Sequence, residues 1–195
     1  VANQGFDVCE LPSVNQMQTW FNASPYETVN LYIGGIARLC DNNSLNAPVL
    51  SQLFSQGWRF IPTWVGPQAP CSAFIKKFSA DPTEARQQGI ENANEAVAAL
   101  NTLGLTNANG SGSIVYYDLE YFEASGNCKA AVTSFLSGWT TRLHELGTYS
   151  GVYSTSSTLS QNQIYAINPP PDAAWIAEWY RIPGYRPNET VWNLL

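Results

Sequence analysis

Short apolar runs bounded by Gly, Pro, Asn or Ser recur along the chain, a pattern typical of β-strands. Between them lie segments with apolar positions at helical intervals, which begin at capping residues or Pro and end at Gly. The predicted strands cover 5–9, 29–35, 58–66, 113–122, 149–155, 173–179 and 191–195. The predicted helices cover 14–24, 48–57, 81–104, 129–147 and 157–166. This alternation of strands and helices predicts a parallel sheet built from βα units.

Such a sheet can stay open, as in doubly wound folds, or close into a barrel. No Gly-x-Gly-x-x-Gly follows the first predicted strand and no phosphate-binding loop occurs, which weighs against a nucleotide-binding sheet. A barrel instead gathers acidic and aromatic residues at the C-terminal ends of its strands. Those found there are Asp7, Trp64, Asp118, Glu120, Tyr153 and Trp179. We therefore predict one α/β domain over 1–195, a (β/α) TIM-type barrel.

The last third of this barrel is expected to be modified or incomplete. Residues 167–195 contain strand-like runs and prolines but no segment with good helical periodicity. The barrel pattern of one helix after each strand therefore breaks down in this part of the chain.

Two acids interrupt an apolar and aromatic run, IVYYDLEYF, over residues 114–122. Because side chains alternate along a strand, Asp118 and Glu120 share one face with Tyr116. The other face carries only apolar and aromatic side chains, Val115, Tyr117 and Leu119. In a parallel barrel the outer face packs on helices, so the two acids should point inward at the mouth. Asp7 ends the first predicted strand in the same way.

Carboxylates that converge on one mouth raise one another's pKa, and an apolar surround raises it further. A raised pKa suits a general acid, and paired carboxylates are what glycoside hydrolysis requires. Two alternatives remain: a non-catalytic groove that binds glycans, or a carboxylate site for a metal ion such as Ca²⁺ or Mg²⁺. His144, the single histidine, lies in a predicted helix and is expected to have a structural role.

The overall charge restricts the partners of this protein. The formal net charge is −6 and charged residues make up only 12% of the chain, which argues against nucleic acids and anionic membrane surfaces. A polysaccharide remains compatible, and we expect a monomer without cofactor or metal. No apolar run has the length needed to span a bilayer. The chain begins at Val1, so processing upstream is expected.

The four cysteines, Cys9, Cys40, Cys71 and Cys128, include no Cys-x-x-Cys pair. With a single histidine in the chain, zinc binding is improbable. Their even number favours disulfides and a secreted protein. The pairing cannot be fixed from sequence, although Cys40–Cys71 is one possible bridge.

Several motifs in this chain occur together in the order found in a known family. They are GFDVCELPS (5–13), YIGG (32–35), GWRFIPTWVGPQAPC (57–71), IVYYDLE (114–120), SGVYSTSS (150–157) and AAWIAEW (173–179). Together they resemble the Rv2525c-like family of secreted bacterial glycoside-hydrolase-like domains, over essentially the whole chain. That family is similar to the glycoside hydrolase family 25 muramidases, lysozymes that cut the glycan of peptidoglycan.

The resemblance implies a modified (β/α) barrel and a role for each acid. Glu120 would be the general acid, Asp118 would steer the substrate's acetamido group or stabilise positive charge, and Asp7 would position these two. The residues implied to line the sugar groove are Tyr153, Trp175 and Trp64. Relatives continue with a further strand and another Asp, so we expect either that VWNLL is not the native end of the domain or that the barrel closes differently here. The expected activity is hydrolysis of a β-1,4-linked, N-acetylated glycan, with peptidoglycan as the substrate.

Overall fold

Six parallel strands form a single sheet in the computed structural model, which describes residues 4–107, 109–123 and 126–177. The strands pair in chain order, β1 to β6, and every pairing is parallel. Their bounds are β1 Gln4–Phe6, β2 Tyr26–Gly34, β3 Arg59–Trp64, β4 Ile114–Asp118, β5 Tyr149–Thr155 and β6 Ala173–Ala177. The predicted βα alternation is therefore confirmed.

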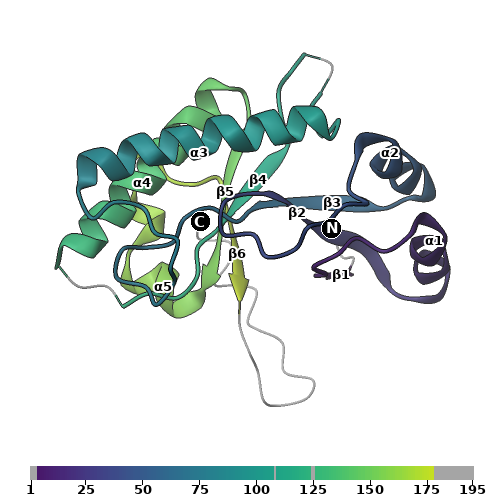
Figure 1. The fold of residues 1–195 in the computed structure, drawn as a ribbon, viewed down its shortest axis with the longest axis horizontal. Helices are drawn as coiled ribbons and strands as arrows, with labels where there is room; N and C mark the ends of the chain where they lie inside the picture. The colour runs from purple at the N-terminus through teal and green to yellow at the C-terminus, as the bar shows by residue number, and fades with distance from the viewer. Residues whose placement is uncertain (1–3, 108, 124–125, 178–195) are drawn as a thin grey trace.

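The sheet curls into a half-barrel, so the predicted barrel is confirmed only in part. Within the described ranges, β1 and β6 remain the two edges of the sheet and do not pair with each other. Figure 1 shows α1 and α2 beside the first strands and the long α3 and α4 beside the later ones. The predicted strand 191–195 and Trp179 lie outside the described residues.

The helices begin and end close to the residues that their capping signals indicate. Their bounds are α1 Val14–Ala23, α2 Ala47–Gln56, α3 Pro82–Thr102, α4 Gly126–Glu145, α5 Ser156–Gln161 and the 3₁₀ turn η1 Ile164–Ala166. Ser13 accepts a hydrogen bond from the Gln16 N–H, and Asp81 accepts two from the first turn of α3. Gly57 ends α2 with φ of 113°, a conformation that favours glycine. The predicted helix 157–166 is divided into α5 and η1.

The outer face of β4 packs on α4. Val115, Tyr117 and Leu119 are fully buried. The Tyr117 ring meets Phe135 and Trp139 of α4 edge-on, with ring centroids 4.9 and 5.1 Å apart. The prediction that Val115, Tyr117 and Leu119 face the helices is therefore confirmed, and Asp118 lies on the opposite face of the strand. None of the helices in the described part of the chain has the length and hydropathy to cross a membrane.

Two disulfides tie the loops that follow neighbouring strands. Cys9, after β1, pairs with Cys40, after β2, and Cys71, after β3, pairs with Cys128 near the start of α4. A Cys40–Cys71 bridge does not form, because Cys40 pairs with the loop after β1 and Cys71 pairs with the first turn of α4. In the loop-closure account each bridge stabilises the fold by about 4 kcal/mol.

Candidate active site

A cavity of about 380 Å³ opens at the C-terminal ends of the strands. Asp7 follows β1, Tyr32 lies near the end of β2, and Asp118 and Glu120 lie at and just after the end of β4. All four side chains line this cavity. The fold therefore brings the three sequence-predicted acids together, although they are up to 113 positions apart along the chain. Their catalytic roles stay predictions.

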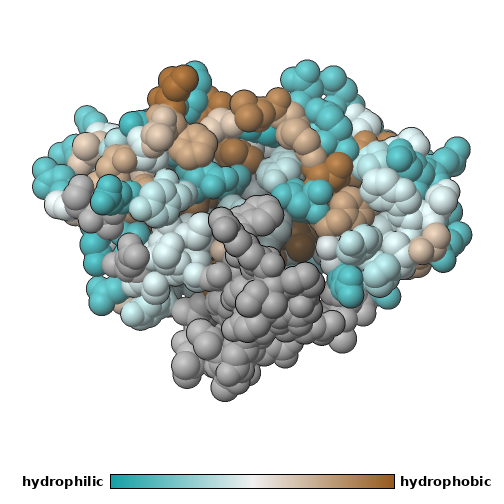
Figure 2. Space-filling view, turned by 90° about the horizontal axis from the view of Figure 1, so that it is seen from below, coloured by the Kyte–Doolittle hydropathy of each residue, from teal (hydrophilic) through white to brown (hydrophobic). Residues whose placement is uncertain are grey.

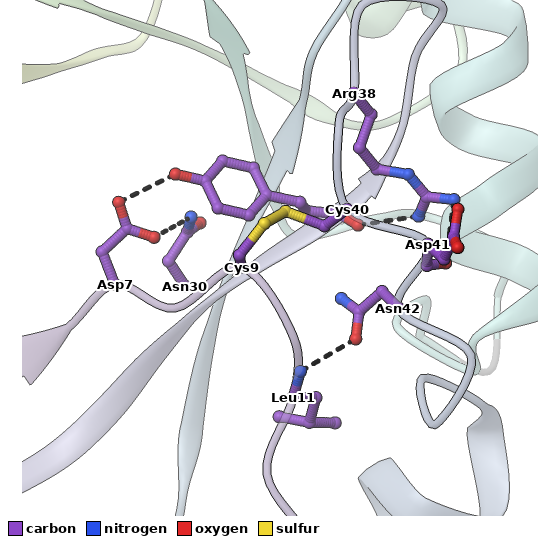
Figure 3. Close-up of a disulfide and its surroundings, with 9 residues drawn as sticks. Asp7, Cys9, Leu11, Asn30, Arg38, Cys40, Asp41 and Asn42 are labelled. Carbon is purple, nitrogen blue, oxygen red and sulfur yellow. Dashed lines mark hydrogen bonds between the residues drawn. A yellow bond between two sulfur atoms is a disulfide. The ribbon is translucent and has the colours of Figure 1, made fainter.

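The Asp7 carboxylate is fixed by two hydrogen bonds from β2. Asn30 Nδ2 donates to Oδ1 at 3.0 Å, and the Tyr32 hydroxyl donates to Oδ2 at 2.8 Å (Figure 3). Thr63 on β3 donates to Asn30 Oδ1 at 2.6 Å, which orients the amide. Burial, followed by the bond to Asp7, raises the pKa of Tyr32, so the phenol remains a donor at neutral pH. Asp7 is thereby held as a rigid acceptor at the wall of the cavity.

Asn30 and Tyr32 are site residues that were not predicted from the sequence. A signal was present, because these two polar positions are two apart in an apolar strand and therefore share a face. The same alternation placed Asp118 and Glu120. Arg38 also lines the cavity, but its guanidinium donates to the backbone oxygens of Tyr32 and Asp41 and points away from Asp7 (Figure 3).

Asp118 is the most perturbed acid of the cavity. The residue is only 7% exposed, and its carboxyl oxygen Oδ1 has no hydrogen-bond partner among the residues that the structure describes. Burial raises the pKa of Asp118 from 3.8 to about 7, and the charges of Glu120 and Asp7 add to this effect. The pKa of Glu120 is raised as well, by partial burial. The two carboxyls therefore titrate as an interacting pair that retains a proton close to neutral pH.

Aromatic side chains from three neighbouring strands lie next to the acids. Tyr153 of β5 is paired in register with Asp118 of β4 and with Trp175 of β6. The Trp175 ring meets Tyr153 and Tyr116 edge-on, with centroids 5.0 and 6.0 Å apart. The charges of Glu120, Asp118 and Asp7 contribute to a raised pKa of Tyr153, which is caused first by burial. Tyr153 thus lies beside Asp118 and Trp175 lies one strand further along the sheet, while their role in lining a sugar groove stays a prediction.

Trp64, the third aromatic residue expected in the groove, is located elsewhere. It is 6% exposed, and its indole Nε1 donates to Asn92 on α3 at 2.8 Å. The preceding residue, Thr63, points inward to Asn30, so alternation turns Trp64 outward to the helices. The structure therefore corrects this expectation: Trp64 is a core residue.

Exposed apolar side chains occur at the end of the sheet where the cavity opens. They belong to the loops that follow β2, β3 and β4, and the most exposed are Leu39 and Ile75, each 95% exposed. Leu39 also lines the cavity itself. The others in these loops are Ile36, Phe74 and Tyr121. Figure 2 shows apolar side chains gathered into patches between polar ones on one face of the molecule. Exposed apolar surface beside a cavity is typical of a binding site.

The described residues include no group of three His, Cys, Asp or Glu side chains arranged to hold a metal ion. The carboxylate metal site that the sequence left open therefore gains no geometric support. His144 lies on α4, where its Nε2 is 2.8 Å from Asp172 Oδ2. Asp172 also accepts from the backbone N–H of Ser150, so this pair ties α4 to β5. The expected structural role of His144 fits this position.

Replacing Asp7 by Asn is expected to lower the pKa of Asp118 by about 0.5–1 unit, because one of the charges that raise it is removed. The Asn oxygen can still accept from Asn30 or Tyr32, so the fold should persist. The shift is measured from the ¹³C carboxyl resonance of Asp118 during a pH titration. Asp41→Asn, on an exposed loop acid, is the matched control and should leave the titration unchanged. An unaltered midpoint in Asp7→Asn would show that the two acids do not interact.

Comparisons with known proteins agree with this architecture. A family model described as "Rv2525c-like, glycoside hydrolase-like domain" matches residues 18–192. An uncharacterized protein of B. stearothermophilus has a similar structure, with a TM-score of 0.62 and 16% identity over 94% of this chain and 82% of its own. The catalytic domain of endolysin ply40, from bacteriophage P40 of Listeria monocytogenes, also has a similar structure. Its TM-score is 0.52, with 16% identity over 90% of this chain and 73% of its own. No curated protein sequence matches the chain significantly.

Proposed function

The chain belongs to the family of Rv2525c-like, glycoside hydrolase-like domains, and from this premise we propose that it is a secreted glycoside hydrolase. Its proposed substrate is a β-1,4-linked, N-acetylated glycan, namely bacterial peptidoglycan. The observation that carries the proposal is the cavity in which Asp118 and Glu120 share a raised pKa beside the fixed carboxylate of Asp7. The similar fold of an endolysin catalytic domain supports the choice of substrate. The two disulfides support secretion.

In the proposed reaction Glu120 is the general acid. It is the more exposed acid of the pair, so it can reach a glycosidic oxygen that enters the cavity. As the bond from the anomeric carbon to this oxygen breaks, the oxygen takes the proton from Glu120. Asp118 lies deeper, where its carboxylate can stabilise the positive charge that develops on the sugar or on its acetamido group. Water then adds to the anomeric carbon and restores the proton to the pair.

The positions of the other side chains fit this scheme. Asp7 cannot move freely, because Asn30 and Tyr32 hold both of its oxygens. Its negative charge therefore acts on Asp118 from a constant position. Tyr153 and Trp175, on the two strands that follow β4 in the sheet, would supply aromatic surface for the apolar C–H groups of sugar rings. Leu39 and its neighbours on the rim can contact a polymer that extends beyond the cavity.

The test is incubation of the pure protein with peptidoglycan and, in parallel, with chitin. The proposal expects falling turbidity of the peptidoglycan suspension together with new reducing ends. Equal cleavage of chitin would support the proposed glycosidase activity and extend its substrates to N-acetylated glycans in general. No new reducing ends from either polymer would overturn the proposal, and activity that is lost with a chelator would favour metal-dependent hydrolysis.

A second candidate is a non-catalytic domain that binds cell-wall glycans. The exposed apolar rim favours it, since a binding surface needs contact area but no proton transfer. It would be identified by co-sedimentation with peptidoglycan without release of reducing ends. Binding that is insensitive to Glu120→Gln would point in the same direction.

A further inference from the structure

Asp118 is the last residue of β4, and Glu120 lies two residues beyond the end of the strand. β4 ends at Asp118, and its ladder with β3 pairs only Thr63 with Tyr116 and Trp64 with Tyr117. Glu120 nevertheless lines the same cavity as Asp118, as it would in a continued strand. Something other than β3 must therefore keep residues 118–120 extended on that side.

On its other side this segment is held by β5. The Leu119 N–H donates to the backbone oxygen of Tyr153 at 3.0 Å. On the side where β3 has ended lies the side chain of Gln68, from the loop after β3. Its Nε2 donates to the backbone oxygen of Asp118 at 2.7 Å, and its Oε1 accepts from the Glu120 N–H at 2.9 Å.

These two bonds follow the pattern of a parallel ladder. There, one residue bonds through its C=O and its N–H to the two residues that flank its partner on the next strand. The Gln68 amide bonds in this way to the two residues that flank Leu119. We infer that Gln68 is a positioning residue whose side-chain amide replaces a strand residue beside β4 and holds Asp118 and Glu120 on one side of the chain. Its role in catalysis rests on the proposed function, whereas its role in geometry does not.

Gln68 is itself held firmly, as a positioning residue must be. It is 1% exposed, its N–H donates to the Lys76 oxygen, and its own oxygen accepts from the Phe78 N–H. The Tyr117 hydroxyl donates to the oxygen of the preceding residue, Pro67, at 2.6 Å. A buried side-chain amide with both ends bonded to backbone resists rotation. The loop after β3 therefore holds the Gln68 amide in a fixed position against the backbone of the acid pair.

The test compares amide hydrogen exchange at Glu120 and Leu119 in native protein and in Gln68→Met, which has similar size but no amide. We expect exchange at Glu120 to accelerate about tenfold or more, because its acceptor is lost, while Leu119 stays protected by Tyr153. Gln56→Met is the matched control, because Gln56 donates to Val14 far from the cavity.

A second readout is the carboxyl titration of Asp118. In Gln68→Met its midpoint should fall by about one pH unit or more, because a released segment becomes solvated. Unchanged exchange at Glu120, equal loss of protection at Leu119, or an unmoved midpoint would each overturn the inference. Should Gln68→Met fail to fold, Gln68→Asn, which keeps the amide but is too short to reach both atoms, gives the same comparison. No measurement needs a substrate, so a negative result is distinct from failure of the proposed glycosidase.

Discussion

Replacement of Glu120 by Gln is expected to lower the rate of glycan cleavage by about 10³-fold. Glutamine has the shape of glutamate but no acidic proton, so it cannot protonate the leaving oxygen. The backbone N–H of Glu120, which donates to Gln68, is unaffected by the change, and the local structure should persist. The rate is measured as the release of reducing ends from peptidoglycan under conditions in which the native protein is active.

Binding and cleavage should respond differently to this substitution. Because glutamine retains the size and polarity of the native side chain, co-sedimentation of Glu120→Gln with peptidoglycan should stay within a few-fold of native. Glu123→Gln, which alters an exposed acid in the same loop, is the matched control and should keep full activity. Equal rates in native protein and Glu120→Gln would remove Glu120 from the mechanism.

Replacement of Asp118 by Asn is expected to stabilise the protein at pH 8 while it abolishes cleavage. The pKa of Asp118 is about 7 in the folded protein, against an ordinary value of 3.8 in an unfolded chain. Between these two pH values the folded protein binds more protons than the unfolded chain, so its stability falls as the pH rises. Above pH 7 the loss is complete and is on the order of 4 kcal/mol, since one pKa unit corresponds to about 1.4 kcal/mol. Asparagine carries no charge and avoids this loss.

The sign of the effect gives a direct test by urea unfolding at two pH values. At pH 4 both proteins have an uncharged group at this position when folded, so their free energies of unfolding should be similar. At pH 8 Asp118→Asn should be the more stable protein, whereas the exposed-acid control Asp41→Asn should show no such dependence. A difference between Asp118→Asn and native that is the same at both pH values would contradict the raised pKa.

Much of the candidate site could be predicted from the sequence because one strand has two clearly different faces. Val115, Tyr117 and Leu119 offer only apolar or aromatic surface, so packing against α4 fixes the phase of β4 and turns Asp118 inward. The capping residues Ser13 and Asp81 fixed helix starts for a similar local reason.

Trp64 shows where local reasoning fails. Parallel strands are buried on both faces, so an apolar run such as 58–66 does not reveal its phase. The bonds from Thr63 to Asn30 and from Trp64 to Asn92 show which side chains of β3 point inward. The pairing of the cysteines likewise depends on which loops are neighbours in space. Gln68 lies in an irregular loop, and nothing in its local sequence indicates the backbone that it contacts.

The unpaired oxygen of Asp118 has a consequence for the proposed reaction. Folding itself has already removed water from this carboxyl, before any ligand arrives. A glycan that binds as proposed would therefore not have to remove water from Asp118 itself.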